Sequence, residues 1–543
     1  MRGGTRKLND SGFDALWDVF EGFLMQMTAN VLLQEEFGTI AALIRAHAAE
    51  RPEATALIKD DRRTTYAELD QLMDRVARAL QREGLQPGDT IAICAKTSVT
   101  YGAVFLGAVR AGVAVAPLPT SSTAATVASF VADCDAKILF LDAEVSNLST
   151  GTELSAALQL VALDNSSQAE AIETWLAPPG VAPAVVKVDP SGAFNIIYSS
   201  GTTGVPKGIV HSHNMRWTQV RRNPLDYGTA SVSIVSTPFY SNTTLVPFFV
   251  TLGYGGAAVL MEKFDAARFL QLAEKHRATH AMLVPVQYQR IMALADFERY
   301  DLKSFVMKVS TSAPFSTGLK ADVLKRWPGG LTEFYGATEG GATCALVVHL
   351  HPTKLHTVGK PVPGCDIRLI DDEGKEVPQG EFGEVVGHSA ITMNGYYKRP
   401  NQTADMEWYD TNGKRFIRSG DVGRFDEDGF LILMDRKKDM IISGGFNIYP
   451  SDLETILCKH EAVLEAAVVG VPSDKWGETP VAFVVLKPGR VAEADILRDW
   501  VNGQVGKTQR LAAVETVPAL PRSTIGKILK RELRERFGSD SRR

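Results

Sequence analysis

A short segment in the middle of the chain carries the residue types that bind a phosphate group. Residues 198–208 read Tyr-Ser-Ser-Gly-Thr-Thr-Gly-Val-Pro-Lys-Gly and follow the apolar run Phe194–Tyr198, which is typical of a buried strand. Glycines let backbone N–H groups approach an anion, hydroxyl groups add donors, and Lys207 adds a positive charge. We therefore predict a phosphate-binding loop here rather than a flexible surface turn. Its predicted contacts are Ser199, Ser200, Gly201, Thr202, Thr203, Gly204 and Lys207.

The segment is not a Walker loop, because that pattern needs Ser or Thr directly after the lysine and Gly208 stands there. It resembles the signature loop of the acyl-adenylate-forming superfamily, which includes acyl-CoA synthetases, the adenylation domains of peptide synthetases and firefly luciferase. The resemblance covers about Phe37 to Phe537 and is strongest to the branch of fatty-acid or aryl-acid CoA ligases. Further segments follow in the family's order: Tyr335–Glu339, Ser419–Asp421, Asp435–Asp439, Ser443–Pro450 and Pro521–Lys527.

The resemblance implies a nucleotide site built from several of these segments. Tyr335 and Gly336 belong to the element whose tyrosine stacks on adenine, Thr338 would contact the α-phosphate, and Glu339 would help to hold Mg²⁺. A hard cation prefers carboxylate and phosphate oxygens together, which suits Glu339 to this role. The resemblance also places Asp421 on the ribose hydroxyls, since a carboxylate can accept at two oxygens. Arg436 would contact ribose or phosphate.

The remaining motifs are predicted to lie on a mobile C-terminal domain. By resemblance, Lys438 is the pivot of that domain, although a charged run of this kind is more often a solvated face. Gly444 and Gly445 would line the tunnel for the pantetheine arm of coenzyme A. Lys527 would reach the substrate carboxylate and a phosphate oxygen during adenylation, with Ser523 in the position where the family has Thr.

The predicted acid pocket departs from the family's pattern. The family's Pro-x-x-His segment corresponds to Thr237–Thr244, which has no histidine, so Tyr240 or Ser241 would replace it. Ser312-Ala313-Pro314 stands where the family has the Gly-Ala-Pro segment that lines the nucleotide and acyl pocket, although an ordinary turn would read the same. The pocket would also be bordered by Phe334, Gly340 and Gly341, with Glu333 near it, and the resemblance implies that Glu333 and Phe334 also contact the nucleotide. Glycines there would leave room for a fatty, branched or aromatic acid.

Two histidines near the phosphate loop are not expected to bind a metal. His211 and His213 lack the spacing and the partners of a metal site. We expect them to lie beside the loop in supporting roles.

The elements that must position these residues change in type along the chain. Short β-rich runs alternate with helical patterns up to about Gly359, which predicts parallel sheets covered by helices. Short strands and a turn at 371–375 then predict a β-hairpin. The predicted fold is α/β: a large N-terminal domain of two parallel-rich αβ subdomains plus a small β-barrel subdomain, then a small mobile α+β C-terminal domain. The predicted boundaries are 1–36 for a helical N-terminal extension, 37–435 for the large adenylation domain, and 436–543 for the C-terminal domain.

Composition excludes several other classes of protein. The net charge of −5 gives no field that would favour nucleic acid. Five scattered cysteines and no signal or membrane-spanning run favour a cytoplasmic protein with reduced thiols. Apolar residues recur at helical spacing between Phe13 and Leu24, which predicts an amphipathic helix docked on the body, on a partner subunit such as that of a homodimer, or, as a minority interpretation, on a membrane surface.

The sequence therefore predicts an ATP-dependent carboxylic acid:CoA ligase that uses ATP, Mg²⁺ and coenzyme A. Thr202, Lys207, Glu339 and Lys527 are the predicted catalytic residues, acting by positioning and charge neutralisation. Three alternatives stay open: an adenylating enzyme that serves a carrier protein, a luciferase-like oxygenase, and a catalytically silent acyl-binding protein.

Overall fold

The computed structural model describes most of the chain. The described residues are 27–148, 158–164, 169–199, 207–223, 225–436, 439–443, 446–473, 476–506, 509–523 and 527–540. The predicted N-terminal helix, most of the predicted phosphate loop, Lys438, Gly444 and Gly445 lie outside the described residues.

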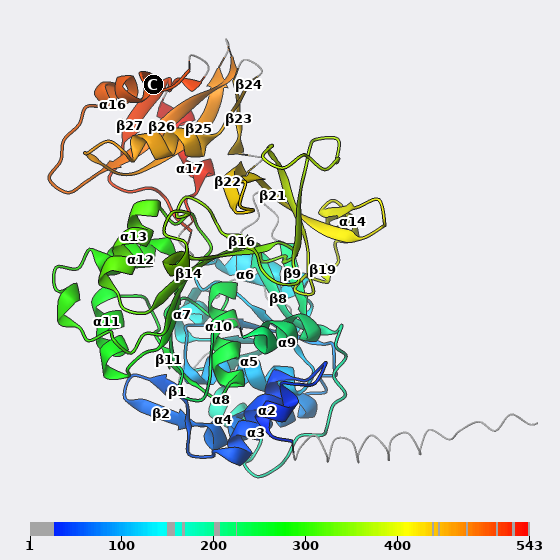
Figure 1. Ribbon diagram of the computed structural model, residues 1–543. Helices are drawn as coiled ribbons and strands as arrows, with labels where there is room; N and C mark the ends of the chain where they lie inside the picture. The colour runs from blue at the N-terminus through cyan, green and yellow to red at the C-terminus, as the bar shows by residue number, and fades with distance from the viewer. Residues whose placement is uncertain are drawn as a thin grey trace, which may run out of the picture.

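Two large sheets form the body of the molecule (Figure 1). The first has the strand order β19 (Gly395–Tyr396), β9 (Lys207–Ser212), β8 (Ala193–Ser199), β4 (Ala114–Pro117), β3 (Thr90–Cys94), β5 (Ala136–Leu141), β6 (Gln159–Ala162) and β7 (Glu170–Ala171). From β8 to β7 the strands run parallel, whereas β9 and β19 pair antiparallel. The fully buried strands β3 and β4 read as unbroken apolar runs, as expected of strands covered on both faces.

The second sheet is also mainly parallel. Its order is β16 (Lys360–Pro361), β15 (Thr343–Val347), β14 (Gly330–Gly336), β13 (Met307–Ser310), β12 (His280–Leu283), β10 (Val232–Val235), β11 (Ala257–Leu260), β1 (Thr55–Lys59) and β2 (Arg62–Thr65). Strands β14 to β1 run parallel, and the edges β15, β16 and β2 are antiparallel. The predicted α/β class with two parallel-rich subdomains is confirmed.

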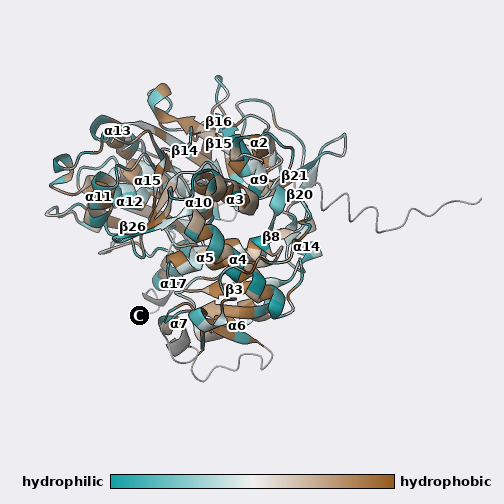
Figure 2. Cartoon of the chain, turned by 90° about the horizontal axis from the view of Figure 1, so that it is seen from below, coloured by the Kyte–Doolittle hydropathy of each residue, from teal (hydrophilic) through white to brown (hydrophobic). Residues whose placement is uncertain are grey.

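Apolar helices pack the two sheets together. Phe105 of α5 (Val99–Arg110) and Phe249 of α10 (Asn242–Gly253) both contact Phe194 of β8, with ring centroids 5.9 and 5.2 Å away. Hydropathy colouring shows α10 as one of the most apolar elements of the body (Figure 2). The two sheets therefore share one hydrophobic core.

The other helices of the body pack on the two sheets and on one another. They are α2 (Ala29–Leu32), α3 (Ile40–Glu50), α4 (Tyr66–Arg82), α6 (Ala124–Asp133), α7 (Ala143–Leu148), α8 (Ile172–Trp175), α9 (His213–Arg222), α11 (Ala266–Lys275), α12 (Pro285–Met292) and α13 (Thr317–Arg326). Several begin at a side-chain cap, as α9 does where Ser212 accepts from the backbone N–H of Met215 at 3.1 Å.

A smaller β subdomain follows the second sheet. It contains β17 (Asp366–Ile370), β18 (Gly383–His388), β21 (Arg415–Phe425), β20 (Glu407–Tyr409) and β22 (Leu431–Arg436), with α14 (Pro400–Ala404) beside it. Strands β17 and β18 form the predicted antiparallel pair. The pairing follows an open path from β17 to β20, with β22 joined to β21, and no ladder among the described strands closes it into a ring.

The C-terminal domain has its own sheet and its own cores. Its elements are β23 (Ile441–Ser443), β24 (Phe446–Ile448), α15 (Pro450–Leu457), β25 (Val463–Ser473), β26 (Gly477–Leu486), α16 (Ala494–Asn502), β27 (Ala513–Thr516) and α17 (Lys530–Asp540). Figure 1 shows this domain in orange and red above the body. It contacts the β subdomain where the rings of Phe382 and Tyr449 lie 6.0 Å apart. No described helix has the length and apolar character needed to cross a bilayer.

Candidate active site

A hairpin holds the two ends of the predicted phosphate loop. Strand β8 ends at Ser199 and β9 begins at Lys207, and these two residues are directly paired across the antiparallel ladder. Gly208 is needed in this hairpin, since a Cβ there would lie 2.7 Å from the side chain of Ile196. The two described ends of the predicted loop therefore lie side by side at the end of a buried strand. Ser200, Gly201, Thr202, Thr203 and Gly204 lie outside the described residues, so their predicted contacts stay predictions.

Lys207 and Glu339 are brought together through a tyrosine that the sequence analysis missed. The Tyr396 hydroxyl donates to Glu339 Oε1 at 2.9 Å. Lys207 Nζ lies 5.0 Å from the centre of the Tyr396 ring, which is a cation–π distance. Strand β19 pairs with β9 opposite Ile209, and this pairing places Tyr396 between the two predicted catalytic residues. We refer to Lys207, Tyr396 and Glu339 as the lysine–glutamate cluster.

Tyr335 and Asp421 also meet, although 86 positions separate them. The Tyr335 hydroxyl donates to Asp421 Oδ2 at 2.8 Å, and burial, followed by the charge of Asp421, raises the pKa of this phenol well above its usual range. Asp421 pairs in register with Arg436 of β22, whose backbone the structure describes. The predicted adenine-binding and ribose-binding residues therefore form one group at the junction of the second sheet and the β subdomain.

Ser312 keeps a backbone conformation that normally favours glycine. Its φ is +76°, in the left-handed region, where the resembling family has glycine. Its Oγ lies 2.8 Å from the hydroxyl of Thr243, in the first turn of α10. Ser241 caps the same helix by accepting from the Thr243 N–H, and Tyr240 precedes it half-buried. The bond between Ser312 and Thr243 therefore joins Ser312-Ala313-Pro314 to the segment predicted to line the acid pocket.

The backbone around Gly340 and Gly341 requires glycine at both positions. Both have left-handed φ, +77° and +81°. A Cβ on Gly340 would lie 2.2 Å from the carbonyl oxygen of Ile391, and one on Gly341 would lie 2.6 Å from that of Gly387. These glycines allow backbone segments to touch, which requires glycine here whether or not an acid binds nearby. Their contact with a substrate stays a prediction.

Glu333 is held in a buried ion pair. It is 4% exposed, and its Oε2 lies 2.5 Å from Nζ of Lys320 in α13. Burial raises the pKa of this carboxyl group, while the charge of Lys320 lowers it. Lys320 also donates to the carbonyl oxygens of Leu355 and Thr357. The structure thus gives Glu333 a structural partner, and its contact with nucleotide stays a prediction. Phe334 beside it is half-buried against the main core.

His211 contacts the backbone of the segment that is predicted to bind nucleotide. It is fully buried at the end of β9, and its Nε2 lies 2.7 Å from the carbonyl oxygen of Thr338. Thr338 directly precedes Glu339, so this bond fixes the backbone beside the lysine–glutamate cluster. His213 is buried as well and packs edge-on against Phe194, with ring centroids 5.2 Å apart.

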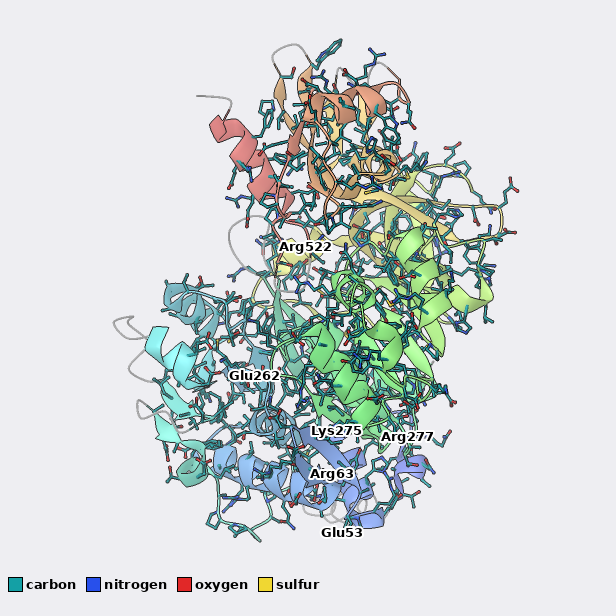
Figure 3. The ribbon with its side chains drawn as sticks, turned by 90° about the vertical axis from the view of Figure 1, so that its left-hand side faces the viewer. Glu53, Arg63, Glu262, Lys275, Arg277 and Arg522 are labelled. Carbon is teal, nitrogen blue, oxygen red and sulfur yellow. The ribbon has the colours of Figure 1, made fainter. Side chains whose placement is uncertain are left out.

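Lys527 lies on the C-terminal domain, outside the lysine–glutamate cluster. Its side chain is exposed, its backbone N–H donates to Ser523 Oγ at 3.2 Å, and its carbonyl accepts from the Ser523 N–H at 2.8 Å. Arg522 just before it forms an ion pair with Glu465. Figure 3 shows Arg522 at the edge where the C-terminal domain meets the rest of the molecule. Lys527 is thus carried close to the junction of the two domains.

Comparison with known proteins identifies the family. A model described as AMP-binding enzyme matches residues 44–397, and one described as AMP-binding enzyme C-terminal domain matches residues 452–527. The chain belongs to the AMP-binding enzyme family. The predicted membership of the acyl-adenylate-forming superfamily is therefore confirmed, and both matched regions contain motifs described above.

Relatives of this AMP-binding enzyme differ in the acceptor that their names give. Fatty acid--[acyl-carrier-protein] ligase ScoC of Streptomyces coeruleorubidus is 30% identical over 93% of this chain and 98% of its own length. Feruloyl-CoA synthase of an Amycolatopsis species is 32% identical over 90% and 96%. The solved structure of the amide bond synthetase McbA from Marinactinospora thermotolerans has a TM-score of 0.82 and 28% identity, over 92% of this chain and all of that one.

Proposed function

We propose that this AMP-binding enzyme is an ATP-dependent carboxylic acid:CoA ligase. It would form an acyl-AMP and pyrophosphate, and then an acyl-CoA thioester and AMP. The observation that carries the proposal is a pair of contacts, that of Tyr396 with Lys207 and Glu339 and that of Tyr335 with Asp421, in which Tyr335 and Glu339 are only four residues apart in the chain. A cation, a carboxylate and an aspartate that could accept from a diol suit the phosphates, the metal ion and the ribose of a nucleoside triphosphate.

The chemistry of acid activation explains what these residues would do. A free carboxylate resists attack because its leaving group would be oxide, so its oxygen first attacks the α-phosphate and pyrophosphate leaves. The protein then needs to hold two anions together and neutralise charge as it develops. Lys207, with Thr202 and Thr203, would hold the phosphates. Lys527 would reach from the C-terminal domain to the substrate carboxylate.

The residues present fit Mg²⁺ held together with phosphate oxygens. Glu339 offers a carboxylate of which one oxygen already accepts from Tyr396. Among the described residues, no group of three or more His, Cys, Asp or Glu side chains could hold a metal ion by themselves. A single protein carboxylate completed by substrate phosphates is the usual arrangement for Mg²⁺, which would neutralise phosphate charge there.

The acid is proposed to be fatty, branched or aromatic. Phe239 lies directly before Tyr240 and stacks on Tyr101, with ring centroids 4.9 Å apart, and it packs edge-on against Phe248 at 4.8 Å. These rings are buried in the core, where they support the segment predicted to line the acid pocket. The names of the feruloyl and fatty-acid relatives agree with this substrate class.

The domain boundaries proposed for this activity remain 1–36, 37–435 and 436–543. The C-terminal domain has separate cores and contacts the β subdomain through Tyr449 and Phe382. A domain of this kind could rotate as one body about the charged run that contains Lys438. Its rotation would remove Lys527 from the active site after adenylate formation and bring Gly444 and Gly445 there for thioester formation.

The experiment that tests the proposal is acid-dependent exchange of pyrophosphate into ATP, measured with a panel of fatty, branched and aromatic acids. Exchange with at least one acid is expected, and its absence with every acid would refute the ligase proposal. Thioester formation after adding coenzyme A would then distinguish a CoA ligase from an enzyme that serves a carrier protein. An amine acceptor, as in the amide bond synthetase, belongs in the same comparison.

A further inference from the structure

A buried arginine without a carboxylate partner lies behind the site. Arg216 of α9 is 1% exposed, yet the described residues include no carboxylate that forms an ion pair with it. Burial lowers its pKa to about 9. A buried charge that is held only by neutral groups is costly, and this protein maintains one between its two predicted substrate segments.

Among the described residues, every hydrogen-bond partner of Arg216 is a neutral acceptor. Nε donates to Asn195 Oδ1 at 2.9 Å, and Nη1 donates at 2.8 Å to both Gln219 Oε1 and Asn242 Oδ1. Nη2 lies 2.9 Å from His211 Nδ1. Its guanidinium therefore ties β8, β9, α9 and α10 together at one point.

These contacts determine which nitrogen of His211 carries the proton. A guanidinium N–H can only donate, so His211 Nδ1 must accept. Since Arg216 Nε faces Asn195 Oδ1, the amide nitrogen of Asn195 faces the same Nδ1, at 3.3 Å. The ring proton is therefore on Nε2, where it is donated to the carbonyl oxygen of Thr338 at 2.7 Å.

The other end of the network reaches the predicted acid-binding segment. Asn242 is the first residue of α10 and follows Tyr240 and Ser241 directly. Thr243, the next residue, bonds to Ser312. A shift of this helix start on acid binding would be transmitted through Arg216 to His211 and so to the residue before Glu339.

We propose that Arg216 is a positioning residue that couples the acid-binding segment to the nucleotide-binding segment through His211. The proposal rests on the proposed function, because it presumes that an acid and a nucleotide bind to these segments. Its consequence is that each substrate strengthens the binding of the other, and that this mutual effect passes through the guanidinium.

The main test compares Arg216→Met with Arg221→Met in the full-length enzyme. Arg221 lies on the same helix but is exposed and donates to the backbone of Glu35 and Glu36. In pyrophosphate exchange with the best acid of the panel, the acid KM of the unmodified enzyme should fall at least about fivefold between low and saturating Mg·ATP. Arg221→Met should keep this ratio, and Arg216→Met should bring it close to one. An unmodified enzyme without the effect, or an Arg216→Met variant that keeps it, would overturn the proposal.

Two substitutions of His211 keep the test decisive if Arg216→Met does not fold. His211→Gln retains an N–H that can reach the Thr338 carbonyl, whereas His211→Leu does not. The kcat/KM for Mg·ATP should fall at least about tenfold in His211→Leu and by much less in His211→Gln. Equal losses in both variants, following their melting temperatures, would indicate a purely structural role and overturn the proposal.

Binding of Mg·ATP alone separates failure of this inference from failure of the proposed function. If no acid supports exchange, the ligase proposal fails, and calorimetric titration with Mg·ATP still tests the path from Arg216 to Thr338. Arg216→Met and His211→Leu should then both bind about tenfold more weakly than Arg221→Met. Equal binding by the three variants would overturn the inference on its own.

Discussion

Tyr396 shows how one residue can complete a site that no short motif reveals. Its ring lies against Lys207 and its hydroxyl donates to Glu339, so a single side chain orients both charges. The neighbouring Tyr397 makes a similar bond to Asp135 at 2.9 Å, but toward the surface. Two adjacent tyrosines thus hold different carboxylates, one at the predicted site and one near the surface.

We expect Tyr396→Phe to lower kcat of acid-dependent exchange about tenfold, because Glu339 loses the bond that orients it. Glu339→Gln should lower it at least about 100-fold, since the negative charge itself is lost. Exchange kinetics measure both. Tyr397→Phe is the matched control and should leave exchange unchanged. Similar exchange rates for Tyr396→Phe and Tyr397→Phe would show that the Tyr396 hydroxyl does not orient Glu339 for the reaction.

Ser312 offers a test of backbone strain. Ser312→Gly relieves a left-handed conformation worth about 1–2 kcal/mol but loses a hydrogen bond to Thr243 worth about 1 kcal/mol, so the free energy of unfolding should change little. Thr243→Val loses the same bond and relieves no strain, so it should be the less stable variant. Urea unfolding of both variants checks the order. A glycine variant less stable than Thr243→Val would contradict the strain argument.

At the scale of elements, the buried pair of Lys320 and Glu333 ties α13 to β14 just before Tyr335. Lys320→Met should lower the free energy of unfolding by about 3–5 kcal/mol, because it leaves a buried carboxylate without its cation. Replacing both residues by methionine should cost less, since no charge is then buried. Chemical denaturation of the two variants gives the comparison, and a double variant as unstable as the single one would argue against an ionic cause.

The same pair predicts a pH dependence. Burial already raises the pKa of Glu333, and removing Lys320 raises it further. Between the unfolded and folded pKa values the folded state binds more protons, so stability falls as pH rises through that window. The free energy of unfolding that Lys320→Met loses relative to the unmodified enzyme should therefore be smaller near about pH 5.5 than near about pH 8. The double methionine variant should show no such difference.

The sequence predicts correctly those elements that short runs of neighbouring residues specify. Strands β3 and β4 are continuous apolar runs, and the turn between β17 and β18 has its own residue signature, so both were predictable. Strand β19 has two residues and exists only because it pairs with β9, which lies far away in sequence. Tyr396 and Arg216 were missed for the same reason: nothing near them in sequence indicates what they contact.

The residues predicted to bind nucleotide and the predicted catalytic lysine Lys527 lie on different domains of the molecule. The large domain contains the lysine–glutamate cluster as well as Tyr335 and Asp421. Lys527, in contrast, is exposed on the C-terminal domain, near the junction of the two domains. A lysine placed in this way can take part in one step and be absent from the next, provided that its domain moves. The two steps should therefore respond differently to its loss.

We expect Lys527→Ala to abolish adenylate formation, measured by pyrophosphate exchange, and to spare thioester formation from supplied acyl-AMP and coenzyme A. The charge of Lys527 is needed only while the carboxylate attacks the phosphate, since the acyl-AMP already contains the bond that it helps to form. Lys459→Ala, an exposed lysine on the same domain, is the control and should retain both activities. Loss of both activities in Lys527→Ala would mean that this lysine supports the fold of the C-terminal domain rather than one step of the reaction.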